Sequence, residues 1–305
     1  MLKAYLDESG HSSDPRCHFV GMGALVATSE KWEEFTVAWK AALDEFIGGA
    51  PFHMKDYICI PPIGPYVGWD ELKRQAFLKR LIDAIVISNA QFIGCVVSME
   101  GFAKLLPEHQ AVLLDPYYLS FQHVTHGCRI SGMTLSEVEL FAGEQVAMIY
   151  AYQADFGTIE SGRTDSQQQG RAEQLWHAMK AQVGPFSKFM GSYASALAAD
   201  VAALQAADLF AYEITKEFEN RLNRPNDKMR WGLRQLFANS DQQPLIIFYG
   251  FETLLENLMD GGHIAENTDI RIASSMLQLG VKMDMEGRYS NDRTAKIQRR
   301  DEEDS

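Results

Sequence analysis

The sequence has only four cysteines in 305 residues, and no two of them form a C-x-x-C pair. Zinc ribbons and disulfide frameworks both need cysteines at short, regular spacings. The sequence therefore predicts neither of these classes, and we interpret the cysteines as small buried apolar residues. They are Cys17, Cys59, Cys95 and Cys128.

Long apolar runs are also missing. No stretch reaches the ~18 consecutive apolar residues that a membrane-spanning helix requires. The first eight residues include Lys3, Asp7 and Glu8, whereas a signal peptide has an apolar core at this position. We therefore expect a cytoplasmic protein that does not enter a membrane.

Basic residues are scarce relative to acidic ones. The chain has 28 Lys and Arg against 41 Asp and Glu, a formal net charge of −13. This balance argues against proteins that coat nucleic acid through overall positive charge. It leaves room for a local nucleic-acid site, and an excess of carboxylates can attract metal cations.

The apolar residues that are present follow strand and helix periodicities. Apolar runs and alternation predict strands at residues 3–7, 18–26, 91–99, 137–143 and 188–196. Helical spacing predicts helices at residues 32–46, 69–87, 116–129, 171–182, 202–222, 229–237 and 251–259. A hairpin followed by mixed helices and strands indicates the α/β class, with a mixed β-sheet flanked by helices. Residues 281–305 have few apolar side chains, which predicts a flexible tail.

The first candidate site is the segment YLDESG at residues 5–10, where two acids arrive as a strand ends. Alternation places Lys3, Tyr5 and Asp7 on one face of this strand, so that Asp7 is expected at the end of the sheet. Taken alone, the segment is better explained as a polar turn.

Two further acids occupy unusual positions. Asp208 lies in an alanine-rich helical segment, where a buried carboxylate needs a cation or hydrogen-bond donors. Gln205 and Tyr212 share its helix face and are the alternative, purely structural partners. Glu144 follows the predicted strand at residues 137–143, with Glu139 as a nearby rival. Acids that converge from distant segments are what a hard divalent cation requires.

Three segments together resemble one family. The segments YLDESG at residues 5–10, FHMKD at 52–56 and LQAAD at 204–208 are similar to those of the domain of unknown function 3800 family of bacterial proteins. The resemblance covers about residues 1–220. It implies a ribonuclease H-like domain, which we place at residues 1–260 with a C-terminal extension at 261–305, and it implies a metal-dependent nuclease.

The resemblance also implies roles for individual residues. Ribonuclease H-like enzymes have one aspartate on the first strand, one acid at the end of the fourth strand and one acid in a late helix. Asp7, Glu144 and Asp208 match these positions as ligands of Mg²⁺ or Mn²⁺, and Glu8 is a fourth catalytic candidate. The candidate substrate-binding or supporting residues are Ser9, His53, Asp56 and Gln205.

A local basic patch is the best candidate for nucleic-acid contact. An ordinary solvated helix face explains these charges equally well. The patch residues are Lys216, Arg221, Arg224, Lys228, Arg230, Trp231 and Arg234.

The sequence thus favours a phosphodiester hydrolase that uses a carboxylate cluster and two Mg²⁺ or Mn²⁺ ions. Two alternatives remain open. One is a non-catalytic module of a mobile-element or defence system that binds nucleic acid or a partner protein, or forms a homo-oligomer. The other is an integrase-like strand transferase. The sequence does not distinguish RNA from DNA as the substrate.

Overall fold

A computed structural model describes most of the chain. The described residues are 1–10, 14, 16–113, 115–137, 145–152, 173, 175–181, 189–224, 227–240, 242, 244–259, 282–283 and 289–290.

A six-stranded mixed sheet forms the centre of the protein, in the order β5-β4-β1-β2-β3-β6. β2 is antiparallel to both β1 and β3, β1, β4 and β5 are parallel to one another, and β6 is parallel to β3. The strands are β1 Leu2–Ser9, β2 Phe19–Thr28, β3 Gln91–Ser98, β4 Val146–Tyr152, β5 Met190–Leu197 and β6 Leu245–Tyr249.

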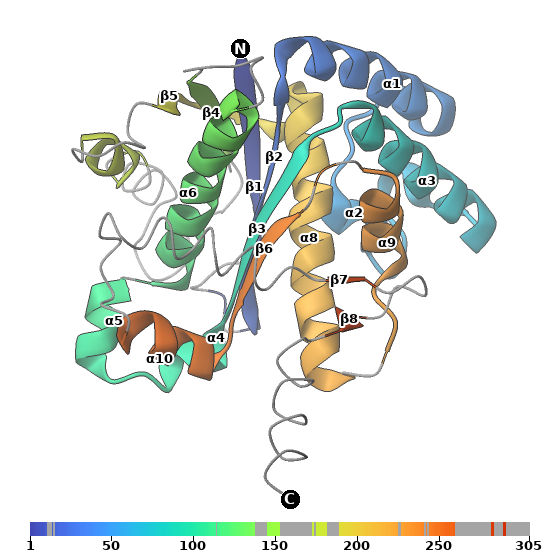
Figure 1. Ribbon diagram of the computed structural model, residues 1–305. Helices are drawn as coiled ribbons and strands as arrows, with labels where there is room; N and C mark the ends of the chain where they lie inside the picture. Colours follow the sequence, from blue (N-terminus) through green and yellow to red (C-terminus); the bar gives the residue numbers. More distant parts are fainter. Residues whose placement is uncertain are drawn as a thin grey trace, which may run out of the picture.

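Helices cover both faces of this sheet (Figure 1). α6 packs on one face, whereas α1, α3, α8 and α9 pack on the other. Each face has its own cluster of buried apolar side chains. The prediction of an α/β protein with a flanked mixed sheet is therefore confirmed. These helices are α1 Ser29–Ile47, α3 Glu71–Ile87, α6 Pro116–Glu137, α8 Ala202–Asn223 and α9 Trp231–Ala238.

Short helices lie at the ends of the sheet and in the connections. Among the described residues these include the α-helices α2 Met54–Ile58, α4 Met99–Ala103, α5 Pro107–Leu113 and α10 Phe251–Met259. They also include the 3₁₀ turns η1 Gly64–Tyr66 and η3 Ala198–Asp200.

Local signals explain where the hairpin and the first helices begin and end. Thr28 caps α1 by accepting from the Lys31 N–H, and Asp70 caps α3 by accepting from the Lys73 N–H. Gly48 ends α1 in the left-handed conformation. Gly10 ends β1 with φ +82°, and a Cβ at this position would lie 2.4 Å from the Phe19 carbonyl oxygen. Only glycine fits at this position, which explains why the segment YLDESG ends in glycine.

Small residues allow α8 to approach the sheet closely. A Cβ on Gly23 of β2 would lie 2.9 Å from the Ala211 backbone nitrogen of α8. A Cβ on Gly21 would lie 2.0 Å from the Thr215 hydroxyl oxygen on the same helix. The alanine-rich segment of α8 meets these glycines, and the backbones of helix and strand come together.

Most of the strand predicted at residues 137–143 lies outside the described residues. Glu137 is the last residue of α6, and the next described strand is β4, Val146–Tyr152. The buried side chains of β4 are Val146, Met148 and Tyr150, an alternation that the sequence already contained. No strand was predicted from the sequence at the position of β6.

The remaining sequence-based expectations concern the tail and membranes. Within residues 261–305 the structure describes only β7, Lys282–Met283, and β8, Tyr289–Ser290, which pair antiparallel. The predicted flexible tail otherwise lies outside the described residues. Among the helices that are described, none is long and apolar enough to cross a membrane.

Candidate functional site

Asp7 lies near the end of β1, with only 8% of its surface exposed. It shares a strand face with Tyr5, which packs against the apolar cluster under α1 and α8. Asp7 Oδ1 accepts a hydrogen bond of 2.8 Å from the Glu8 backbone N–H. Its carboxylate therefore has a fixed orientation on the α8 side of the sheet.

Asp208 lies on α8 with 9% of its surface exposed. Its Oδ2 accepts a 2.8 Å hydrogen bond from the Met54 backbone N–H, which ties α8 to the start of α2. Three residues later on α8, Ala211 packs against Gly23, and Gly23 is the direct cross-strand partner of Asp7. The close approach of α8 to β2 thus brings the two predicted aspartates to one place.

The two carboxylates influence each other. Burial, and next the negative charges of Asp208 and Glu8, raise the pKa of Asp7 well above its usual range. Burial also raises the pKa of Asp208, while the His53 charge and the Met54 N–H oppose this shift. Among the described residues, no Lys or Arg forms an ion pair with Asp7 or Asp208. The site therefore holds two buried acids that no Lys or Arg of the described residues neutralises.

Glu8 belongs to the other side of the sheet. The even-numbered β1 residues Leu2, Ala4 and Leu6 pack in the cluster under α6. By the same alternation Glu8 follows them, and its charge raises the pKa of Tyr117 and of Tyr193 on that side. Glu8 and Asp208 therefore lie on opposite faces, whereas Ser9 shares the face of Asp7.

Gln205 has a supporting role that its contacts define. Its Oε1 accepts hydrogen bonds of 3.0 Å from Trp39 Nε1 and from the Phe52 N–H. Its Nε2 donates to the carbonyl oxygens of Ala198 and Ala199, at 3.0 and 3.3 Å. Gln205 thus fixes the segment that leads into α2, one turn before Asp208 on the same helix.

His53 and Asp56, which the family resemblance implies as supporting residues, lie close enough to Asp208 to act on its charge. His53 is the exposed residue that precedes α2, and Asp56 is half-buried within it. The charge of His53 lowers the pKa of Asp208, whereas that of Asp56 raises it. Both residues therefore act electrostatically on the buried aspartate.

Glu144 lies outside the described residues, two positions before the start of β4. Val146, the first residue of β4, pairs with Leu2, at the opposite end of β1 from Asp7. The role of Glu144 as a metal ligand therefore stays a prediction. The first acid after β4 in the sequence is Asp155, which also lies outside the described residues.

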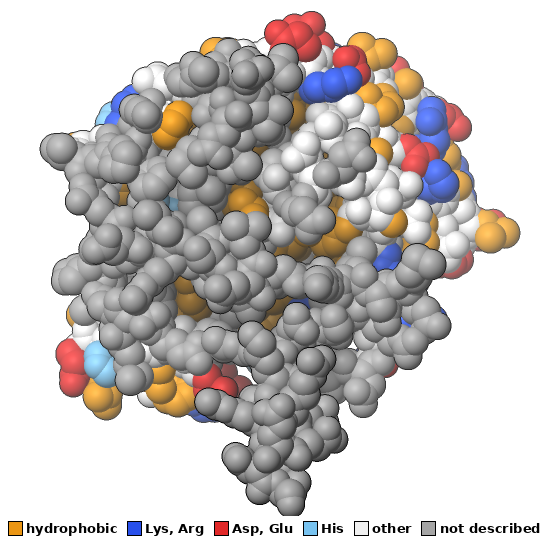
Figure 2. Space-filling view, in the orientation of Figure 1, with side chains coloured by type: hydrophobic (Ala, Val, Ile, Leu, Met, Phe, Trp, Pro, Cys, Tyr) orange, Lys and Arg blue, Asp and Glu red, His pale blue; other side chains and the backbone are white. Residues whose placement is uncertain are grey.

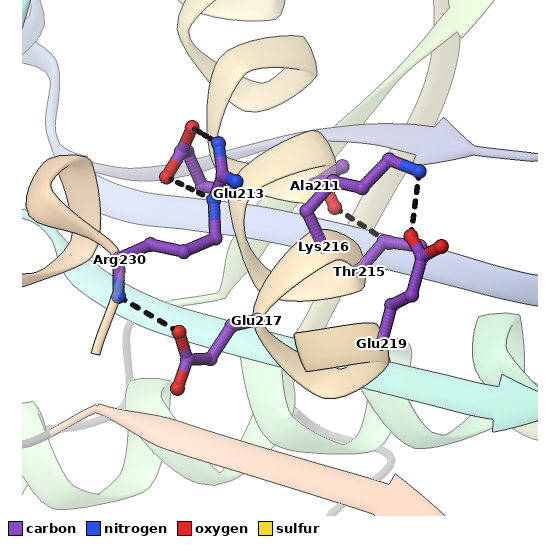
Figure 3. Close-up of polar contacts among 7 residues, drawn as sticks. All are labelled: Ala211, Glu213, Thr215, Lys216, Glu217, Glu219 and Arg230. Carbon is purple, nitrogen blue, oxygen red and sulfur yellow. Dashed lines mark hydrogen bonds and ion pairs between the residues drawn. The ribbon is translucent and has the colours of Figure 1, made fainter. Parts of the chain in front are cut away.

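The predicted basic patch is largely paired with acids. Arg230 donates from Nε and NH2 to both carboxylate oxygens of buried Glu213, at 3.0 and 2.8 Å (Figure 3). Glu217, also buried, accepts from the Arg230 backbone N–H and from Arg221 Nε. These contacts join α8 to the segment before α9.

The other predicted patch residues are more exposed. Lys216 pairs with Glu219 at 2.6 Å, and Arg224 approaches Asp227 at 3.8 Å. Lys228 and Trp231 are exposed, and Arg234 is half-buried. In the described surface that Figure 2 shows, basic and acidic side chains are interspersed. A role of the patch in nucleic-acid binding stays a prediction.

Asp7 and Asp208 alone are too few side chains to form a complete metal site. Within the described ranges, no group of three or more His, Cys, Asp and Glu side chains is arranged to hold a metal ion. The two aspartates supply hard oxygen donors of the kind that Mg²⁺ and Mn²⁺ prefer. Comparison with known proteins found no matching family model and no matching curated protein.

Proposed function

We propose that this protein is a Mg²⁺- or Mn²⁺-dependent phosphodiester hydrolase with a ribonuclease H-like domain. One observation carries the proposal: Asp7 from the first strand and Asp208 from a late helix lie buried on one face of the sheet, without a Lys or Arg ion-pair partner among the described residues. These are two of the three acid positions that the resemblance to the domain of unknown function 3800 family implies.

The donor set fits a divalent cation. Two like charges held together in a buried place are costly, and a cation offsets this cost. Asp7 and Asp208 would hold it, with a third acid to be identified. When bound, such an ion activates water for attack on phosphorus and stabilises the leaving oxygen.

The chain's own residues prepare this site. The Glu8 and Met54 backbone N–H groups orient the two carboxylates. Gln205 fixes the segment that carries Met54, and burial keeps water away from the acids. Asp7, whose pKa is raised, retains a proton to higher pH than an ordinary aspartate and releases it when a cation takes its place.

Calorimetric titration with Mn²⁺ and Mg²⁺ tests the site directly. We expect binding to the wild type and loss of binding in Asp208→Asn, which keeps the size of the side chain but removes its charge. Asp200→Asn is the matched control, because Asp200 is an exposed acid just before the same helix. A wild type that binds neither ion would rule out the proposal.

Cleavage assays then separate the three functions. A hydrolase should cut at least one of single-stranded RNA, duplex RNA, DNA or a hybrid with Mn²⁺ or Mg²⁺, and Asp7→Asn and Asp208→Asn should abolish cutting. Binding of nucleic acid without cutting would assign the non-catalytic module. Products joined to a second strand would assign a strand transferase.

A further inference from the structure

Tyr66 combines complete burial with a hydroxyl group that lacks a partner. The residue is 1% exposed, and its Oη has no hydrogen-bond partner in the described part of the chain. Its ring packs against those of Tyr57, Trp69 and Phe77, at centroid distances of 5.5, 5.3 and 6.3 Å. A phenylalanine would make these ring contacts without burying an unpaired hydroxyl, which is costly.

The hydroxyl lies next to the candidate site. Tyr66 packs on Tyr57 of α2, the helix whose first N–H holds Asp208. Burial, and next the negative charge of Asp56, raise the pKa of Tyr66, and the charge of Asp208 adds to this effect. The hydroxyl therefore keeps its proton and is available as a hydrogen-bond donor near two carboxylates.

Asp56 is the complementary group. Across the residues that the structure describes, its carboxylate forms no hydrogen bond and no ion pair. The neighbouring Tyr57 differs, because its hydroxyl donates to the Arg74 carbonyl oxygen at 2.9 Å. Near α2, the Tyr66 hydroxyl is thus a donor and the Asp56 carboxylate an acceptor, and neither has a partner among the described residues.

We propose that Tyr66 is a positioning residue of the Asp7–Asp208 site, whose hydroxyl donates a hydrogen bond to the Asp56 carboxylate when the site binds a divalent cation. This inference rests on the proposed function of the same site. A cation at Asp208 attracts the Asp56 carboxylate, and the Tyr66 hydroxyl then fixes its orientation. Partners that orient groups around a metal in this way typically change its affinity by about 10- to 100-fold.

Tyr66→Phe tests the proposal with two measurements. The metal-free variant should have a higher melting temperature, because an unpaired buried hydroxyl has been removed. Its affinity for Mn²⁺, measured by calorimetry, should fall by about 10-fold. Tyr57→Phe is the matched control: it loses a formed hydrogen bond, so its melting temperature should fall while its Mn²⁺ affinity stays unchanged.

A double-mutant cycle with Asp56→Ala, which removes the acceptor, identifies the partner. If Tyr66 acts through Asp56, Tyr66→Phe should weaken Mn²⁺ binding little further in the Asp56→Ala background. Unchanged Mn²⁺ affinity in Tyr66→Phe, a lower melting temperature, or independent effects of the two substitutions would each overturn the proposal. A wild type that binds no Mn²⁺ would instead remove the proposed function itself, and this inference with it.

Discussion

Gly23 of β2 is the direct cross-strand partner of Asp7 in β1, and it is also where α8 touches the sheet. A Cβ on Gly23 would lie 2.8 Å from the Phe210 ring and 2.9 Å from the Ala211 backbone nitrogen. The absence of one side chain thus lets the helix that carries Asp208 reach the strand that carries Asp7. The site depends on a residue that takes no part in its chemistry.

Gly23→Ala should therefore push α8 away from the sheet. We expect a loss of about 1–3 kcal/mol in the free energy of unfolding, as for overpacked cores, and weaker Mn²⁺ binding. Chemical denaturation and calorimetry measure the two effects. Gly250→Ala is the control, because a Cβ there has no atom within 4 Å, and it should change neither quantity. A stable Gly23→Ala protein with unchanged Mn²⁺ affinity would contradict this account of the site.

Asp7→Asn should stabilise the metal-free protein at neutral pH. The pKa of Asp7 is raised in the folded state by burial and by the charges of Asp208 and Glu8. A raised pKa contributes stability that is fully present below the unfolded pKa, near 3.8, and that is lost as pH rises through the folded pKa. Urea denaturation between pH 4 and 8 should show the variant gaining on the wild type as pH rises. If the two free energies of unfolding changed in parallel with pH, the pKa of Asp7 would not be raised in the folded state.

His123 predicts a second pH dependence, of opposite sign. Burial lowers its pKa to about 4, and its ring contacts the Tyr249 hydroxyl, with Nε2 at 2.9 Å. The neutral form is favoured by folding, so this contribution is present above the unfolded pKa of 6.5 and is lost as pH falls towards 4. The loss amounts to about 3 kcal/mol.

The measurement is the free energy of unfolding across this pH range. His123→Gln, which can keep a hydrogen bond to Tyr249, should flatten the curve between pH 4 and 6.5. His177→Gln is the control, because His177 has a side chain that is 63% exposed. It should leave the curve unchanged.

Arg230 should matter for stability far more than an exposed arginine does. Arg230→Ala leaves Glu213 buried without its side-chain partner, which typically costs about 3–5 kcal/mol. Glu217 keeps the backbone N–H of residue 230 and its pair with Arg221. Arg16→Ala is matched to it, because Arg16 also pairs with an acid, Asp14, but its side chain is 88% exposed. This second change should leave the free energy of unfolding almost unchanged. Equal losses in denaturation experiments would show that the α8 network contributes little.

Local signals made much of the fold predictable. Thr28, Asp70 and Gly48 act on neighbouring residues, and the helices that they cap were predicted from the sequence. The sequence also showed that Asp208 needed a partner. It could not identify the Met54 N–H, because that contact joins residues 154 positions apart.

Two sequence-based interpretations, of Glu8 and of the basic patch, left out information that bears on them. The alternation that placed Asp7 on one face of β1 also separates Glu8 from it. The basic patch was read from composition, whereas the pairing of Arg230 with Glu213 depends on how the chain turns between α8 and α9. Charges can be counted in a sequence, but their partners are set by the fold.

The third acid of the proposed site could come from before β4, as Glu144, or from after it, as Asp155. β4 is parallel to β1, and Tyr150 pairs with Leu6, next to Asp7. Glu144 instead precedes Val146, which pairs with Leu2, and Leu2 and Asp7 are about 17 Å apart at the rise of a strand. We therefore expect Glu144→Gln to leave Mn²⁺ affinity and cleavage unchanged. Asp155, the first acid in the sequence after β4, gives the contrasting variant Asp155→Asn, which should reduce both by at least about 10-fold. The opposite result, with Glu144→Gln inactive and Asp155→Asn active, would restore Glu144 as the ligand and remove the register of β4 as a guide to the site.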